Sequence, residues 1–72
     1  MANRIKKHPT YYKIKGYQII NQISDEKAAD ALGVCVRTFR EKRDGYGDFT
    51  LSQGDKLSEI LGQSKDVLFS YA

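Results

Sequence analysis

Apolar residues recur at helical spacing along most of this chain. The clearest stretch is SDEKAADALGV, in which Ala28, Ala29 and Leu32 share one helical stripe. Ser24 is a good N-cap, and Gly33 suits the left-handed conformation that ends many helices. The pattern therefore predicts a short helix between these two residues.

A second short helix is expected over VRTFREKR, directly after that glycine. Phe39 faces inward in this helix, and its basic residues point mostly outward. The sequence RDGYGD then predicts a turn.

The stretch TLSQGDKLSEILG predicts a longer helix. Thr50 and Gln53 have the spacing of a capping box, and Gly62 closes the helix. Gly54, inside this helix, fits a close approach of backbones. Ser64 then caps a last short turn. The apolar residues at helical spacing here are Leu57, Ile60, Leu61, Val67, Leu68 and Phe69.

The upstream stretch YYKIKGYQIINQI predicts a first helix, with apolar contacts from Ile19, Ile20 and Ile23. Gly16 weakens this prediction because glycine costs about 1 kcal/mol against alanine inside a helix. A strand over residues 17–20 remains the alternative. Residues 1–10 are expected to form a basic flexible arm. The expected fold is all-α, a small bundle of about five short helices in one domain over residues 11–72.

Length and composition exclude several classes of protein. Seventy-two residues allow one small domain and leave no room for a large enzyme pocket. A single cysteine, Cys35, and a single histidine, His8, form neither a disulfide nor a four-ligand zinc site. Cys35 is expected to be a small packed side chain. With no apolar run long enough for a signal peptide or a membrane span, we expect a cytoplasmic protein without cofactor, metal or catalytic activity.

The net charge of +3 hides a strong asymmetry along the chain. Residues 1–23 carry five basic residues and no acid, residues 24–36 are net acidic, and residues 37–43 are net basic. Basic patches are the usual electrostatic footprint of phosphate binding, although a solvated charged face has the same composition.

The two short helices around Gly33 have the spacing of a helix-turn-helix. Ala29 lies four residues before the glycine and Phe39 six residues after it. A small side chain is needed at Ala29 because the second helix crosses close to the first there. Leu32 and Val34 are expected to help Phe39 hold the angle between the helices.

These residues carry a resemblance to a known family. AADALGVCVRTFREKRDG, followed by FTLSQGDKLSEILGQSKDVLF, resembles the phage repressor and Cro family of helix-turn-helix proteins over about residues 17–70. The resemblance implies a transcriptional regulator of a lysis-lysogeny switch that binds operator DNA as a dimer, within the host bacterium. Its second helix would enter the major groove. The implied DNA-binding residues are Val36, Arg37, Arg40, Glu41, Lys42 and Arg43.

Within that set, the resemblance implies different roles. Arg37 and Arg40 would read base edges, because the arginine fork can bond O6 and N7 of guanine together. Lys42, Arg43 and the basic arm would neutralise phosphates.

Departures from the family pattern favour an alternative. Asp25 and Glu26 stand where the family often places a glutamine that bonds a phosphate, and Cys35 with Val36 opens the second helix instead of a hydroxyl or acidic cap. The alternative is an antirepressor similar to the modulator-of-repression proteins of lactococcal temperate phages, which act by forming a complex with the phage repressor. Its expected partner-binding residues are Asp25, Glu26, Asp30, Val36, Arg37 and Tyr46.

Overall fold

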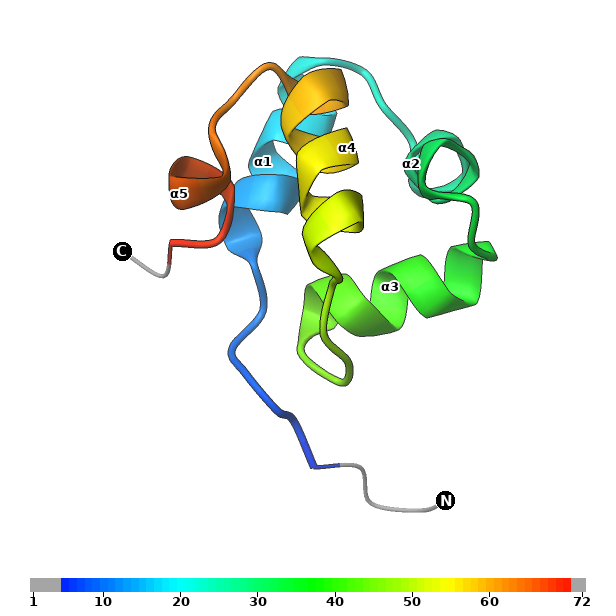
Figure 1. Ribbon diagram of the computed structural model, residues 1–72, viewed down its shortest axis with the longest axis vertical. Helices are drawn as coiled ribbons and strands as arrows, with labels where there is room; N and C mark the ends of the chain where they lie inside the picture. Colours follow the sequence, from blue (N-terminus) through cyan, green and yellow to red (C-terminus); the bar gives the residue numbers. More distant parts are fainter. Residues whose placement is uncertain (1–4, 71–72) are drawn as a thin grey trace.

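The chain folds into a small all-α bundle. The computed structural model describes residues 5–70, and every regular element in that range is a helix. The helix α4 packs against α1, α2 and α5, while α2 and α3 pack against each other (Figure 1). The five helices are α1 (Tyr12–Ile20), α2 (Asp25–Leu32), α3 (Val36–Asp44), α4 (Leu51–Leu61) and α5 (Lys65–Leu68).

The helix ends follow the capping residues of the sequence. The Ser24 hydroxyl accepts a hydrogen bond from the backbone N–H three residues on, at 3.1 Å, and Gly33 ends α2 with a φ of 73°. Thr50 and Gln53 form the expected capping box at the start of α4, and Gly62 ends that helix with a φ of 68°. These boundaries are confirmed because each rests on a local hydrogen bond or a left-handed glycine.

Residues 17–20 are helical, so the alternative of a strand there is wrong. The prediction also assigned the apolar contacts of Ile19 and Ile20 to the wrong side of this helix. Ile14 and Gln18, four residues apart, are its buried residues, whereas Ile19 and Ile20 are exposed. Each residue turns the helix by about 100°, so the positions that follow Gln18 rotate away from the core. Ile23, beyond the helix, is partly buried as expected.

The core is built from large apolar side chains contributed by α1, α3, α4 and α5. Next to it, the rings of Tyr11, Phe49 and Phe69 pack together, with centroids 5.0 Å apart between Tyr11 and Phe69. Gly54 is buried, and a Cβ there would lie 3.3 Å from the Phe69 ring. The close approach at Gly54 is therefore to a side chain and not to a backbone. The largest fully buried side chains are Phe39, Ile14, Leu57, Leu61 and Leu68.

The segment before α1 is bound to the loop that follows α3. The amide of Lys7 donates to the carbonyl of Gly45 at 2.6 Å, and Nε2 of His8 lies 2.7 Å from the carbonyl oxygen of Gly47. The Thr10 hydroxyl donates to the carbonyl of Asp44 at 3.0 Å. Residues 7, 8 and 10 are thus hydrogen-bonded to the folded domain, within the stretch 1–10 for which the sequence predicts a basic flexible arm. The remainder of that arm, residues 1–4, lies outside the described residues.

Candidate interface on the helix-turn-helix

The helices α2 and α3 form the expected helix-turn-helix unit. Ala28 and Ala29 are buried on α2, and the amide of Val34 returns a hydrogen bond to the carbonyl of Ala29 at 3.0 Å across the turn. Leu32 and Val34 are partly buried and pack against the core cluster to which Phe39 belongs. These contacts fix the angle at which α3 leaves the turn and therefore which of its side chains face outward.

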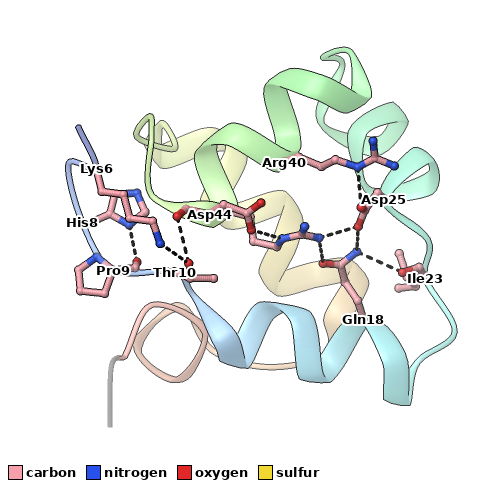
Figure 2. A network of polar contacts seen from close by, with 10 residues as sticks. Lys6, His8, Pro9, Thr10, Gln18, Ile23, Asp25, Arg40 and Asp44 are labelled. Atoms are coloured by element: carbon pink, nitrogen blue, oxygen red, sulfur yellow. Dashed lines mark hydrogen bonds and ion pairs between the residues drawn. The ribbon is translucent and has the colours of Figure 1, made fainter. Parts of the chain in front are cut away.

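The carboxylate of Asp25 joins three helices at the start of α2. It accepts a hydrogen bond from Nη1 of Arg43 at 2.6 Å, from Nε of Arg40 at 2.8 Å and from Nε2 of Gln18 at 3.0 Å. Arg43 also donates to Oε1 of Gln18 at 3.2 Å, which closes a ring of polar contacts (Figure 2). We call Gln18, Asp25, Arg40 and Arg43 the Asp25 cluster.

The placement of Arg43 on a phosphate-binding face is wrong. Its side chain is buried, with 6% of the residue exposed, and its guanidinium lies 5.5 Å from the Phe39 ring centroid. Phe39 and Arg43 are four residues apart on α3 and so share the stripe that faces inward. The burial of Arg43 could have been predicted from this four-residue spacing to Phe39 in the sequence. Gln18, which the sequence analysis did not single out, stands in the same relation to the buried Ile14.

The pKa of Asp25 lies below its usual value of 3.8. Burial raises this pKa, but the hydrogen bonds from Arg40, Gln18 and Arg43 together outweigh that effect and hold the carboxylate in its charged form.

We expect the fold to become less stable as the pH decreases, because of the ionisation of Asp25. Because the folded pKa lies below the unfolded one, the carboxylate stabilises the fold above about pH 4, and this contribution is lost as the pH falls further, through the folded pKa. Thermal melts between neutral pH and about pH 3 test this expectation. The Asp25→Asn variant should show a shallower dependence on pH, and Asp30→Asn, which changes an exposed carboxyl, should keep the wild-type slope. Equal slopes for wild type and Asp25→Asn would contradict it.

The outward face of α3 carries arginines that already have acidic partners. The Arg37 side chain is 85% exposed, and its Nε lies 3.3 Å from Oε2 of Glu41. Arg40 is half exposed and pairs with Asp25, while its Nη2 lies 3.9 Å from Oε1 of Glu26. Lys42 is partly buried and donates to the Gln53 side chain at 2.9 Å. All three arginines of α3, Arg37, Arg40 and Arg43, are therefore ion-paired within the chain.

The expected partner-binding residues divide into two groups. Glu26, Asp30 and Arg37 are exposed, with 72% of the Glu26 side chain accessible. Asp25, Val36 and Tyr46 are only partly accessible. Val36 opens α3, while Tyr46 follows its C-terminus and has the Lys6 ammonium 5.7 Å from its ring centroid. We call the exposed charged residues Glu26, Asp30, Arg37 and Arg40 the candidate interface.

Cys35 is exposed and not packed as expected. Its Sγ lies 3.0 Å from the Thr38 hydroxyl. This hydrogen bond lowers the pKa of the thiol below its usual 9.0.

Within residues 5–70, no group of His, Cys, Asp and Glu side chains is arranged to hold a metal ion. None of the helices in that range has the length and apolar character needed to cross a bilayer. No family model, curated protein or solved structure matches this chain. The candidate interface is therefore assessed on its own geometry.

Proposed function

We propose that this protein is a phage-type helix-turn-helix regulator whose α2–α3 face binds a protein, the DNA-binding domain of a phage repressor. One observation carries this proposal: every arginine of α3 is paired with a carboxylate of the chain, at N to O distances of 2.6–3.3 Å for the closest contacts. A protein with this function is an antirepressor, which would act by covering the surface with which the repressor binds its operator.

The charge pairing argues against operator DNA as the main partner. Affinity for duplex DNA comes largely from cations that neutralise phosphates and release counterions. Arg43 is buried, and Arg40 would have to leave Asp25 before it could bind a phosphate. Glu26, exposed at the α2 N-terminus, repels a phosphate at the helix end that would otherwise attract one.

The same charges suit the DNA-reading surface of a repressor. Such a surface is cationic because it must bind phosphates. Glu26 and Asp30 can pair with its basic residues, and Arg37 and Arg40, with their guanidinium planes, can contact its polar and aromatic groups. Arginine is also among the residues enriched at interface hot spots.

A charge reversal at Glu26 tests the proposal. Glu26→Lys should weaken binding to the purified repressor DNA-binding domain by tenfold or more, since a favourable pair becomes a repulsive one, equivalent to about 1.4 kcal/mol or more. The matched control is Glu59→Lys on α4, because Glu59 is equally exposed and likewise lies beside a basic residue, with Nζ of Lys56 at 3.7 Å. Isothermal titration calorimetry of wild type and both variants measures the difference.

Asp25 is unsuitable for this test because it holds α1, α2 and α3 together. Equal losses for Glu26→Lys and Glu59→Lys would show that net charge alone matters and would contradict an interface at Glu26. No binding of the wild-type protein to the repressor would overturn the proposal itself.

Operator binding is the second candidate, and the exposure of Arg37 favours it. A surface ion pair between residues four apart on a helix is worth about 0.3–0.5 kcal/mol, so Arg37 can leave Glu41 at little cost and reach a base edge. A fluorescence-anisotropy titration with the intergenic duplex beside the gene, against a scrambled duplex, separates the candidates. Sequence-specific binding lost in Arg37→Ala would support this second function. Either activity would take place in the cytoplasm of the host bacterium.

A further inference from the structure

The imidazole ring of His8 lies between two carbonyl oxygens. Its Nε2 is 2.7 Å from the carbonyl oxygen of Gly47, and its Nδ1 is 2.8 Å from that of Pro9 (Figure 2 shows the contact with Pro9). Both distances are those of hydrogen bonds, and a carbonyl oxygen can only accept one. Both hydrogen bonds therefore form only when each ring nitrogen carries a proton, which is the case in the imidazolium ion.

A neutral imidazole does not fit this position equally well. It carries a single N–H, so its second nitrogen presents a lone pair to a carbonyl oxygen at hydrogen-bond distance. Only 8% of the His8 side chain is exposed, so water has little access to compensate a lost hydrogen bond. Loss of the proton therefore removes one hydrogen bond from the contact and sets two lone pairs against each other.

The other titratable groups around this ring favour the same protonation state or leave it unchanged. The carboxylate of Asp48, in the loop after α3, lies 4.0 Å from Nε2 and is 70% exposed, so it favours the imidazolium weakly. Tyr11 stacks on the ring with the centroids 4.3 Å apart, and tyrosine is neutral near neutral pH. Lys6 and Asp44, charged residues of the same contact, bind other side chains.

The backbone around His8 fits closely against the end of α3. The amides of Lys7 and His8 both donate to the carbonyl of Gly45, at 2.6 Å and 3.3 Å. A Cβ at Gly45 would overlap the carbonyl oxygen of His8, so the approach requires glycine at this position. The segment therefore has no room to move closer to the loop when the ring changes its charge.

We propose that His8 is a pH-sensitive switch, which binds residues 7–10 to the loop after α3 strongly when its ring is doubly protonated and weakly when the ring is neutral. Histidine changes its charge between about pH 5 and pH 8, so the segment detaches more often at the upper end of this range. Detachment frees the basic residues Lys6 and Lys7 and takes the Lys6 ammonium from the Tyr46 ring, whose centroid lies 5.7 Å away. The switch uses no residue of the candidate interface, so it does not depend on the function proposed above.

Urea denaturation of the full chain at about pH 6 and about pH 8 tests the proposal. Because the imidazolium makes one more hydrogen bond in the folded protein, His8 stabilises the fold at the lower pH, and this contribution is lost as the pH rises. The unfolding equilibrium constant should therefore rise about threefold or more between the two pH values. A Cys35→Ser background is used because the pKa of this thiol lies below its usual 9.0, which brings its titration closer to pH 8.

His8→Gln is the matched variant in the same background. Glutamine is uncharged at both pH values, so the unfolding constant of this variant should lack the threefold rise. Asp48→Asn removes the exposed carboxylate and keeps the imidazole, so it should retain most of the pH dependence. A protein with His8 that is no more sensitive to pH than His8→Gln overturns the proposal. Loss of the whole effect in Asp48→Asn would assign it to the ion pair and would contradict a role of the two carbonyls.

NMR spectra of the wild-type protein give a second measurement that needs no variant. His8 is the only histidine of the chain, so its ring signals are unambiguous. At about pH 6 both ring N–H protons should be visible, and the Nε2 proton should show a nuclear Overhauser effect to the α protons of Gly47. The amide signal of Lys7 should shift as the ring loses its proton at higher pH. A ring that becomes neutral while the Lys7 signal stays unchanged would show that the attachment ignores the charge of His8.

Discussion

Replacing Arg43 with alanine is expected to lower the free energy of unfolding by about 3 kcal/mol. The guanidinium is buried, pairs with Asp25 at 2.6 Å and donates to both Gln18 and Asp44. Its removal leaves a partly buried carboxylate with fewer donors, opens space beside Phe39 and loses a cation–π contact. For a domain of this size such a loss is a large part of the total stability.

Urea denaturation followed by circular dichroism measures the effect on Arg43→Ala. The matched control is Arg37→Ala, which removes an exposed arginine from the same helix and should cost less than about 0.5 kcal/mol. If the two variants were equally stable, Arg43 would have no structural role, and the conclusion that the Asp25 cluster holds α1, α2 and α3 together would be wrong.

Replacing Phe39 with alanine is expected to be at least as destabilising, by about 3–5 kcal/mol. Phe39 is fully buried, its ring centroid lies 6.0 Å from that of Phe49, and the Arg43 guanidinium lies 5.5 Å from its ring centroid. It is the large apolar side chain that α3 contributes to the fully buried core. Loss of the ring therefore leaves a cavity and removes the main apolar attachment of α3.

Thermal melts followed by circular dichroism, together with proton–nitrogen NMR spectra, report the effect of Phe39→Ala. Phe39→Leu is the control and should cost less than about 1.5 kcal/mol, because it keeps most of the buried apolar volume. The spectra of Phe39→Ala should lose dispersion first in α3. A stable Phe39→Ala variant with α3 unchanged would mean that the Asp25 cluster alone holds this helix.

The helix boundaries were predictable because their causes are local. A serine or threonine N-cap, a capping box and a glycine with positive φ all act within four residues, so Ser24, Thr50, Gly33 and Gly62 identify α2 and α4 from the sequence. The buried face of α1 was harder to predict. Three isoleucines near its end suggested a buried face, whereas packing selected Ile14 and the polar Gln18.

The candidate site was only partly predictable from the sequence. The helix-turn-helix geometry and the exposure of Arg37 followed from spacing. The partners of Asp25 did not, because Gln18, Arg40 and Arg43 are seven to eighteen residues away and meet it only after three helices have packed. Residues that are distant in sequence and meet only in the folded protein leave no periodic pattern in the sequence. Within a basic stretch, the sequence does not distinguish a buried arginine from an exposed one.

The contact between residues 7–10 and the loop after α3 has a consequence for the dynamics of the domain. It joins parts of the chain 34 to 39 residues apart through few hydrogen bonds, including those from Thr10 to Asp44 and from His8 to Gly47. A long loop closed by few bonds opens at a lower free energy than the core. The amide hydrogen of Lys7 should therefore exchange with solvent by detachment of this segment, long before the amides of α4 exchange through global unfolding. Such openings expose Gly45 and the C-terminal end of α3 while the helix-turn-helix itself stays folded.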